Sequence, residues 1–311
     1  MSFFISKSFR AMGTVNTITI FEEGREEILE QAAARVMELH DRLTVFDPGS
    51  QISRINANAG ISAVQVSHDT FRLLQEAVRF SRETEGAFSV TIRPLTALWH
   101  IGVSSGVLPE AEKIAAARKL VNDKDLIFSE NSREVMLRYR GQGLDLGGIA
   151  KGYAADEVKR ILTEGGIQDA IINLGGSVII LGQPREIGIQ HPRRETGVSM
   201  GSLVTSGEAV VTSGDYERCF FKEGRRYSHI LDSRTGMPAV SGLCQATLAG
   251  PSAMTADALT TAIFVLGAEK GSSLAQKYGY ELLLVTEQLN LYCSEGMRSR
   301  FRLQNPAQTA N

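Results

Sequence analysis

The stretch GLDLGGIAKGYAAD, residues 143–156, determines how the rest of the chain is interpreted. From Ile149 onward, apolar side chains recur at near-helical spacing with charged side chains between them, which predicts an amphipathic helix. Gly147 and Gly148 stand just before that helix, and Lys151 lies on its first turn. Backbone N–H groups at a helix entrance attract anions, and a lysine adds a full positive charge. The local chemistry suits a phosphate or pyrophosphate, with Asp145 free to hold a base, a sugar or a metal.

The same glycine pair has a simpler interpretation. A Gly-Gly before a helix is also the ordinary mark of a tight turn, so this segment alone leaves the turn and the ligand site both open. It is not a Walker loop, because Ile149 and Ala150 separate Lys151 from the last glycine. No G-x-G-x-x-G fingerprint of a dinucleotide-binding fold occurs either.

Composition restricts the class of protein. The chain has 311 residues, of which 43% are hydrophobic and 22% charged, and its formal net charge is −2. These are ordinary values for a folded protein, and they do not support binding to nucleic acid or to a membrane surface. The three cysteines are widely spaced and fit neither a disulfide framework nor a zinc site. No stretch is long and apolar enough for a signal peptide or membrane insertion, so as written we expect a cytoplasmic protein.

Hydrophobic periodicity predicts alternating helices and strands along the whole chain. Helices are expected at residues 26–43, 68–83, 110–120, 149–162 and 253–266. Strands are expected at residues 15–21, 86–92, 126–128, 135–137, 170–174, 177–181, 187–189, 203–211, 219–221, 282–285 and 291–293. Residues 53–58 are polar and rich in Asn, and residues 298–311 are expected to form a tail. No linker separates two domains.

Three further groups of polar residues are candidates for chemistry. On the helix at 253–266, Asp257, Thr260 and Thr261 share one face and offer the hard oxygen ligands that Mg²⁺ or Ca²⁺ prefers. Threonine back-bonding to the helix is the alternative for the two hydroxyls. His229, close to Asp232, is either a general base with an orienting acid or a turn histidine. Residues 216–218 either bind a ligand or are solvated turn residues.

The order of several short motifs resembles that of a known family. The motifs are Met12-Gly13-Thr14, Phe46-Asp47-Pro48, Gly86-Ala87-Phe88, the run 145–153, Asn173-Leu174-Gly175-Gly176, residues 213–218, His229-Ile230-Leu231-Asp232 with Arg234-Thr235-Gly236, and residues 254–259. From about residue 9 to the final hairpin, the chain resembles the ApbE family of flavin transferases, the FAD:protein FMN transferases. The match consists of independent motifs over nearly the whole chain.

This resemblance implies a fold and an activity. The expected fold is α+β, with mixed sheets and packed helices in two lobes of one ApbE-like (T-fold-like) domain and with FAD between the lobes. The domain would span residues 1–311, with a core at about 9–303 and a tail at 304–311. The implied reaction is Mg²⁺-dependent (Mn²⁺ possible) transfer of FMN from FAD to a Thr or Ser hydroxyl of an acceptor flavoprotein, with release of AMP.

The resemblance also assigns roles by position. The expected FAD contacts are Met12, Phe46, Ala87, Phe88, Ser89, Asp145, Lys151 and the backbone near Leu231. Asp257, Thr260 and Thr261, with an oxygen at Gly148, would hold the metal, and His229 takes the position of the family's base. Two alternatives remain, namely an FAD pyrophosphatase, in which water replaces the acceptor hydroxyl, and a non-catalytic FAD-binding or delivery protein.

The chain departs from the family's usual residues at four positions. Ser89 stands where many members have Asp, and Arg93 stands where Gly is common. Ser233 replaces the usual Pro after Asp232. Phe46 takes the place of a frequent Tyr or Trp, which keeps an aromatic face for stacking. Many members of the family also act outside the cytoplasm.

Overall fold

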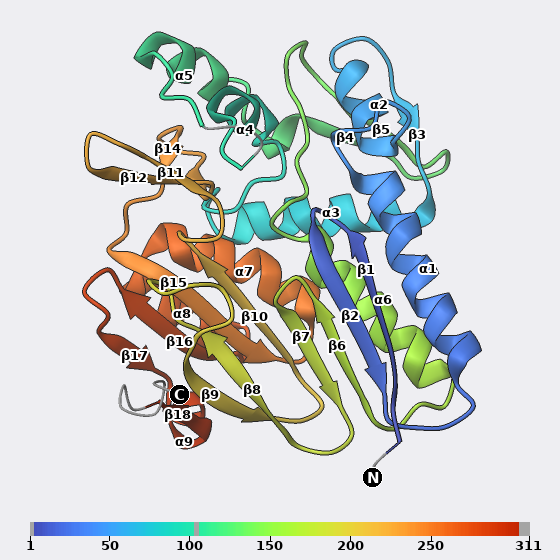
Figure 1. The fold of residues 1–311 in the computed structure, drawn as a ribbon. Helices are drawn as coiled ribbons and strands as arrows, with labels where there is room; N and C mark the ends of the chain where they lie inside the picture. Colours follow the sequence, from blue (N-terminus) through green and yellow to red (C-terminus); the bar gives the residue numbers. More distant parts are fainter. Residues whose placement is uncertain (1–2, 103–105, 305–311) are drawn as a thin grey trace.

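The computed structural model describes residues 3–102 and 106–304. Its centre is a single eight-stranded sheet, which occupies the lower half of Figure 1. In spatial order the strands are β1 (Ile5–Ala11), β2 (Thr14–Ile20), β6 (Ala170–Leu174), β7 (Ser177–Leu181), β10 (Ala209–Gly214), β15 (Leu243–Gly250), β16 (Glu281–Thr286) and β17 (Leu291–Cys293). The α+β class is confirmed. Between the named strands of the described residues every ladder is antiparallel, so the expectation of mixed sheets was wrong.

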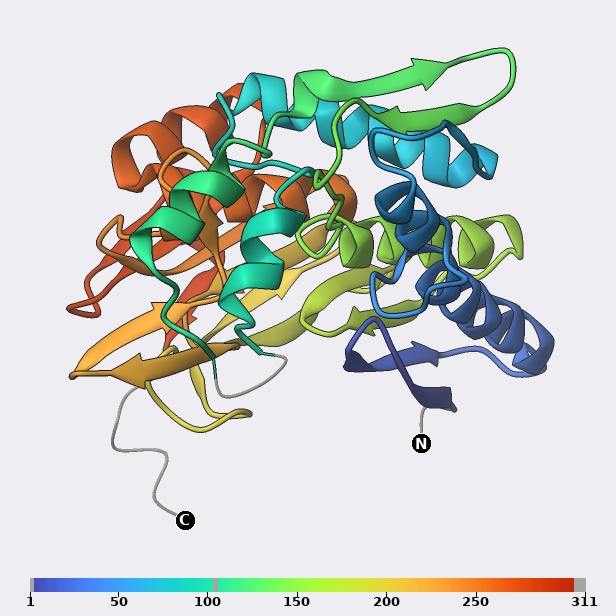
Figure 2. The same ribbon diagram turned by 90° about the horizontal axis from the view of Figure 1, so that it is seen from above.

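Helices cover one face of the large sheet. They are α1 (Glu26–Leu43), α6 (Ala150–Glu164), α7 (Ala253–Leu266) and α8 (Ala268–Lys277), and Figure 2 shows them together on one side of the strands. Helix α7 lies deepest, because it packs against α6, α8, β10 and β15 together. Its sequence is accordingly apolar on almost every side, the pattern of a buried helix.

The opposite face of the sheet is partly covered by a small three-stranded sheet. Its strands are β18 (Phe301–Leu303), β9 (Ser199–Thr205) and β8 (Arg185–Gln190), and the short helix α9 (Glu295–Arg300) lies beside them. Ile189, Met200 and Leu203 from this layer pack against Val210 and Leu283 of the large sheet. Because both of its faces are covered, all eight residues of β15 are buried.

Shorter elements extend beyond the upper end of the sheet in Figure 1. One group contains α2 (Gln51–Ala57), α3 (His68–Glu83), β3 (Val64–Gln65), β4 (Leu126–Ser129) and β5 (Glu134–Leu137). The other contains α4 (Arg93–Trp99), α5 (Ala111–Arg118), β11 (Cys219–Lys222), β12 (Arg225–Ser228), β13 (Leu231–Asp232) and β14 (Met237–Pro238). The second group has its own small core of Leu95, Trp99, Ile114, Tyr227 and Leu231.

Most of the predicted elements are confirmed, and three predictions were wrong. The expected strand at 203–211 is interrupted, because β9 ends at Thr205 and β10 begins at Ala209, and residues 298–303 lie in α9 and β18 rather than in a tail. Residues 305–311 are outside the described part of the chain. The expected strand at 86–92 is a bent segment, because the Asp123 carboxylate accepts the N–H groups of Val90 (3.0 Å) and Thr91 (2.9 Å) that a neighbouring strand would otherwise bind.

No helix in the described ranges has both the length and the hydrophobicity that crossing a bilayer requires. The longest, α1, has 18 residues and alternates buried positions with charged ones.

Asp156 joins the two helices that carry the candidate site. From α6, its carboxylate accepts the Ser252 hydroxyl (2.7 Å) and the N–H groups of Ala253 (2.8 Å) and Met254 (3.0 Å) at the beginning of α7. Ser252 also accepts the N–H of Thr255 (3.2 Å), as expected of the cap. The N–H groups that a helix leaves unpaired at its start are thus bound by side chains.

We predict that Asp156→Ala lowers the free energy of unfolding by about 2–3 kcal/mol, because several buried donors lose one charged acceptor. Urea denaturation measures the change. The control is Glu164→Ala at the exposed end of the same helix, where the carboxylate pairs only with Arg160 and its loss changes stability by less than about 1 kcal/mol. Equal stability of the two variants would contradict the capping role.

Candidate active site

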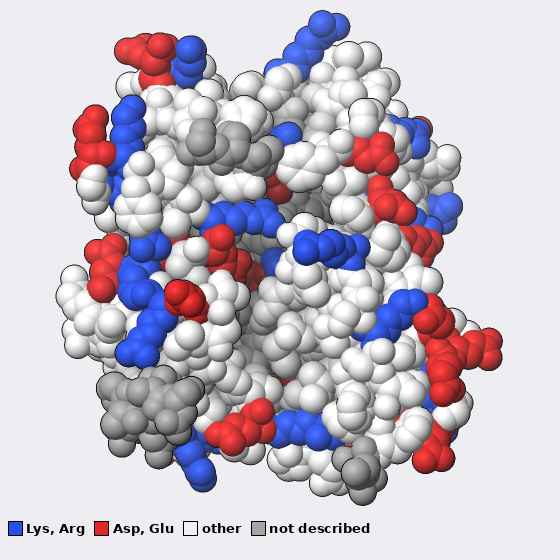
Figure 3. All heavy atoms as spheres, in the orientation of Figure 1, with Lys and Arg blue, Asp and Glu red and all other residues white. Residues whose placement is uncertain are grey.

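The site lies where the first turns of α6 and α7 meet. Gly152 of α6 has no room for a side chain, since a Cβ there would collide with the carbonyl of Ala253 and with Asp257. Its N–H donates to Oδ2 of Asp257 at 3.0 Å. The face of the molecule in Figure 3 is hollowed near its centre, where Figure 1 draws the β1–β2 turn and the upper end of β10. Acidic and basic side chains both border this hollow.

Asp257 is the buried charge of the site, with 3% of its surface exposed. While Oδ2 accepts the Gly152 N–H, Oδ1 lies 3.6 Å from Nζ of Lys151. Lys151 also donates to the Gly147 carbonyl at 3.3 Å. The free face of this carboxylate therefore already faces a positive charge.

The threonine hydroxyls and Gly148 lie on the same side of α7. Thr260 and Thr261 both donate to the Asp257 carbonyl, at 3.1 and 3.2 Å, so the predicted back-bonding is present. The Thr260 hydroxyl also accepts from the Ser213 hydroxyl at 2.9 Å, so it keeps one free lone pair, whereas a hydroxyl that only donates keeps two. A Cβ on Gly148 would lie 3.1 Å from the Thr261 hydroxyl oxygen, which places that glycine against the same group.

These oxygens form a donor set that fits a hard divalent cation. One carboxylate, two hydroxyls and nearby carbonyls are the ligand types that Mg²⁺ and Mn²⁺ take, without the nitrogen or sulfur that zinc prefers. Within the described ranges no group of three or more His, Cys, Asp or Glu is placed to hold a metal. A cation here would therefore carry net positive charge toward an anionic substrate.

Asp145 and Gly147 are engaged with each other rather than left open. The Gly147 N–H donates to Asp145 Oδ1 at 3.0 Å, and the Thr96 hydroxyl donates to Oδ2 at 2.8 Å. The side chain of Asn56 bonds both the N–H (2.6 Å) and the carbonyl (3.0 Å) of Leu144, which fixes this segment. The positive character predicted for the glycine pair therefore comes from Lys151 and the start of α6.

His229 is oriented by a backbone carbonyl. The backbone N–H of His229 donates to the Arg218 carbonyl at 2.9 Å, and the ring Nδ1 lies 3.2 Å from the same oxygen. A protonated Nδ1 donating to that carbonyl leaves Nε2 as the free acceptor. Burial, together with the positive charges of Arg218 and Lys151, lowers the pKa of His229 to about 4, and the hydrogen bond to the Arg218 carbonyl partly opposes this shift. The imidazole is neutral at pH 7.

Asp232 is not the partner of His229. Its carboxylate accepts the N–H of Arg234 at 2.9 Å and two guanidinium nitrogens of the same residue at 2.8 Å each. The hypothesis of an orienting acid at Asp232 was wrong, because the adjacent arginine binds that carboxylate. A carbonyl has no signature in sequence, so the true partner of His229 was not predictable from residue types.

Residues 216–218, left undecided by the sequence, lie near Lys151 and Asp257, and Asp215 directly precedes them. Burial raises the pKa of Glu217 above its ordinary value, Lys151 lowers it and the charge of Asp257 raises it, so this carboxyl lies within electrostatic range of both. Arg193 holds the segment through two hydrogen bonds to Asp215, at 2.6 and 2.9 Å. Arg218 reaches across to the β1–β2 turn, where a Cβ on Gly13 would lie 3.0 Å from its guanidinium.

The other residues expected to contact FAD differ in how deeply they are buried. Met12 forms the β1–β2 turn at φ 53°, and its N–H donates to Nδ1 of His40 at 3.2 Å. Ala87 and Phe88 are buried, with the Phe88 ring against Gly148. Ser89 is buried and donates to Asp123 at 2.6 Å, so its hydroxyl faces the interior.

Two of the residues that depart from the family pattern have visible partners. Ser233 donates to the Gly86 carbonyl at 2.6 Å and so ties the His229 segment to the bend beside Phe88. Leu231, two residues before it, is buried in the small core of the same group. Arg93 lies with its guanidinium 5.8 Å from the centre of the Phe46 ring and 3.9 Å from Asp145.

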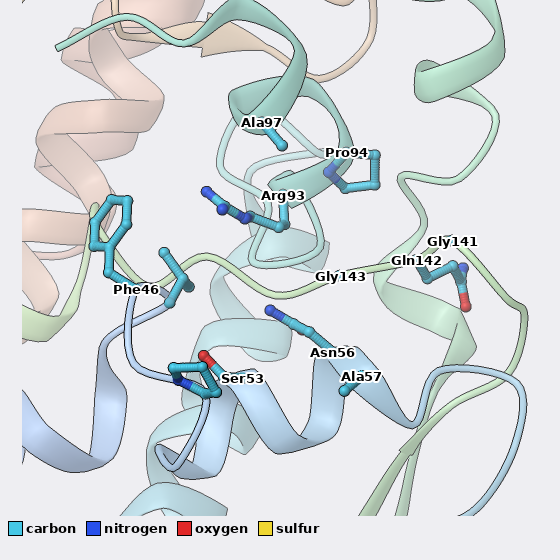
Figure 4. Close-up of a pocket in the computed structure, with 12 residues that line it drawn as sticks. Phe46, Ser53, Asn56, Ala57, Arg93, Pro94, Ala97, Gly141, Gln142 and Gly143 are labelled. Atoms are coloured by element: carbon cyan, nitrogen blue, oxygen red, sulfur yellow. The ribbon is translucent and has the colours of Figure 1, made fainter. Parts of the chain in front are cut away.

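Phe46 and Arg93 border a pocket of about 420 Å³, shown in Figure 4. Phe46 is 67% exposed, which is unusual for a phenylalanine, and in the figure Arg93 points toward it. The pocket continues between α2 and α4 over Asn56, Pro94, Ala97 and residues 141–143. An exposed ring beside a guanidinium offers a flat surface on which a planar group can stack.

Known proteins are similar to this chain over most of its length. The ApbE family model matches residues 12–284. An FAD:protein FMN transferase of Klebsiella pneumoniae is 39% identical, over 88% of this chain and 87% of its own. One from Vibrio cholerae is 31% identical, over 89% of this chain and 85% of its own.

The crystal structure of an ApbE protein from Thermotoga maritima superimposes with a TM-score of 0.88 at 32% identity, covering 96% of this chain and 99% of the other. The flavin transferase ApbE from Vibrio cholerae superimposes with 0.84 at 27% identity and the same coverage. The chain therefore belongs to the ApbE family.

Proposed function

We propose that this protein is an FAD:protein FMN transferase, which moves FMN from FAD to a Thr or Ser hydroxyl of an acceptor flavoprotein and releases AMP. The observation that carries the proposal is that Lys151 lies 3.6 Å from the buried Asp257 and also acts electrostatically on a neutral His229. Relatives of known name that cover most of this chain carry the same activity. The chain would act as one domain, residues 1–311, with its core at about 9–303.

FAD would lie in the hollow between the upper elements and the large sheet. Its pyrophosphate is assigned to the start of α6, where Lys151 supplies a positive charge. The exposed Phe46 ring suits a planar part of FAD, and Met12, Asp145 and the backbone near Leu231 would border the rest. Ala87 and Phe88 shape the wall beside Gly148, and Ser89 would support that wall through Asp123.

Asp257, Thr260, Thr261 and an oxygen at Gly148 would hold the cation. When bound, Mg²⁺ (or Mn²⁺) would neutralise pyrophosphate charge and stabilise the leaving AMP. Lys151 lies close enough to share that charge, because its ammonium is 3.6 Å from Asp257. The Gly152 N–H would hold Asp257 in place, and the other carboxylate oxygen would be available to the cation.

His229 would accept the proton of the acceptor hydroxyl. The oxygen attacks the phosphorus of the FMN half, the bond from that phosphorus to the AMP oxygen breaks, and the proton goes to Nε2. Burial and two cations keep the imidazole deprotonated at neutral pH, so it is always in the accepting form there. A base of low pKa is weak, and its contribution therefore depends on position more than on basicity.

The same residues would also support hydrolysis of FAD to FMN and AMP, with water in place of the hydroxyl. A non-catalytic FAD-binding or delivery protein would need neither the base nor the cation. To separate the three, the protein is incubated with FAD, Mg²⁺ and candidate acceptor domains, and each product is followed by mass spectrometry. Added FMN mass on an acceptor supports the transferase, AMP without it indicates the hydrolase, and neither product indicates the binder.

We predict that Asp257→Asn abolishes Mg²⁺-dependent AMP release and FMN transfer while the fold survives. Asn keeps an oxygen for the Gly152 N–H but removes the negative charge that a cation needs. Circular dichroism and thermal unfolding verify the fold, and isothermal titration with Mg²⁺ in the presence of FAD measures cation binding. A variant that still releases AMP at the wild-type rate in limiting Mg²⁺ would refute the ligand assignment.

A second prediction concerns His229→Gln, which keeps an amide donor for the Arg218 carbonyl but has no base. FAD affinity should stay near the wild-type value, while FMN transfer slows by about 10²–10⁴-fold. The wild-type rate should rise with pH through a step near pH 4, where the imidazole loses its proton, and the variant should lack that step. Transfer at the wild-type rate by the variant would return His229 to a structural role.

A further inference from the structure

Arg218 reaches from the His229 side of the hollow to the β1–β2 turn. It immediately precedes β11, and its side chain passes between two glycines. A Cβ on Gly102 would lie 2.5 Å from Cδ of Arg218, and a Cβ on Gly13 would lie 3.0 Å from a guanidinium nitrogen. Both glycines have positive φ, 80° and 73°, which disfavours any other residue there. The two glycines therefore leave the space that this arginine occupies.

The guanidinium of Arg218 has no carboxylate partner in the part of the chain that the structure describes. Two other arginines nearby differ in this respect, because Arg193 and Arg226 both lie within ion-pair distance of Asp215. Arg218 itself is exposed. A guanidinium that is held in position without a counter-charge is available to an anionic ligand, and phosphate is the anion whose geometry it matches.

Two titratable side chains respond to both Arg218 and Lys151. Burial, then the positive charges of Arg218 and Lys151, lower the pKa of His229. Burial raises the pKa of Glu217, and the same two cations oppose that shift. Each cation is therefore within electrostatic range of both groups. An anion beside His229 would lie near two positive charges that come from different parts of the fold, one on α6 and one next to β11.

We propose that Arg218 is a further catalytic residue, which binds the phosphate of the FMN half of FAD and stabilises the charge on that group during transfer. This inference rests on the proposed function. While the acceptor oxygen attacks and the bond to the AMP oxygen breaks, negative charge is spread over the non-bridging oxygens of the transferred phosphoryl group. A guanidinium offers two parallel N–H donors to such oxygens and stays protonated throughout. The hydroxyl proton still goes to Nε2 of His229.

The position of Arg218 assigns it to the FMN phosphate rather than to the AMP phosphate. Its carbonyl orients His229, and the proposed base must lie beside the oxygen that attacks the FMN phosphorus. The attacking and leaving oxygens lie roughly in line on opposite sides of that phosphorus, so the AMP oxygen departs on the side away from the base. Lys151 and Asp257, on the two helices, would serve that departing side.

Binding of the separate halves of FAD tests the contact without turnover. Isothermal titration in the presence of Mg²⁺ compares FMN with riboflavin, and AMP with adenosine. The ratio of FMN affinity to riboflavin affinity reports the contact with the FMN phosphate. This ratio should fall by about fivefold in Arg218→Gln, which keeps a polar side chain but removes the charge. The ratio of AMP affinity to adenosine affinity should not change.

Turnover then tests the catalytic part of the proposal. Arg218→Ala should lower kcat for FMN transfer by about 10²-fold and raise the KM for FAD by no more than about fivefold, because the contact strengthens as charge develops. Guanidinium chloride at a non-denaturing concentration should restore part of the lost rate, since the ion can enter the space between Gly13 and Gly102. A side chain that only packs would not be replaced by a soluble cation.

Arg225→Gln and Arg225→Ala are the matched controls. Arg225 is exposed at the tip of the same hairpin, and its guanidinium lies 5.3 Å from the centre of the Tyr227 ring. Both controls should leave the affinity ratio and kcat at the wild-type values. Thermal unfolding verifies that each variant is folded, and Arg218→Gln carries both measurements if Arg218→Ala does not fold.

Three results would overturn the proposal. They are an FMN-to-riboflavin ratio that is the same in Arg218→Gln and in the wild type, equal losses with the Arg225 variants, and transfer at the wild-type rate by the Arg218 variants. If the ratio falls as expected but the wild type neither adds FMN to an acceptor nor releases AMP, the phosphate contact stands and the transferase does not. If the wild type transfers FMN and Arg218→Gln does so equally fast with an unchanged ratio, the transferase stands and the role of Arg218 does not.

Discussion

The reciprocal capping of α6 and α7 is the constraint on which the site depends. Asp156 of α6 binds the first N–H groups of α7, and Asp257 of α7 binds the N–H of Gly152 in α6. The two helix starts carry like partial charges and would repel each other at this separation. A carboxylate from each helix at the start of the other offsets that repulsion, and Gly152 leaves the space that makes the approach possible.

This arrangement explains why a buried carboxylate is available for chemistry. One oxygen of Asp257 accepts the Gly152 N–H of α6, and the other faces Lys151, so the carboxylate charge has a partner on both sides. A buried charge without a partner strongly destabilises the fold, whereas a buried carboxylate that faces a cation does not. The part of the site that would hold the pyrophosphate is therefore stable before any ligand arrives, and little reorganisation is needed on binding.

The sequence predicted what is local and missed what is long-range. The structure has α1 at 26–43 and α7 at 253–266, as the periodicity predicted, with the Ser252 cap and Gly267 in place, because apolar spacing and capping act within a few residues. The bend at 86–92 depends on Asp123, and the orientation of His229 depends on a carbonyl eleven positions away in the chain. Such partners leave no local pattern. The grouping of Lys151, Asp257 and His229 followed from the family resemblance, not from spacing.

The fold also places the residues proposed to bind phosphate and cation on different elements from the proposed base. Lys151 and Asp257 lie on helices fixed against the large sheet, whereas His229 follows a hairpin fixed against Trp99 in the smaller group of elements. Ser233 ties the His229 segment to the Gly86 carbonyl beside Phe88, and Arg193 holds Asp215, the residue after β10 from which the chain runs toward the hairpin. Loss of the Ser233 hydrogen bond would therefore shift the proposed base while Lys151 and Asp257 keep their places, and group transfer tolerates such misplacement poorly.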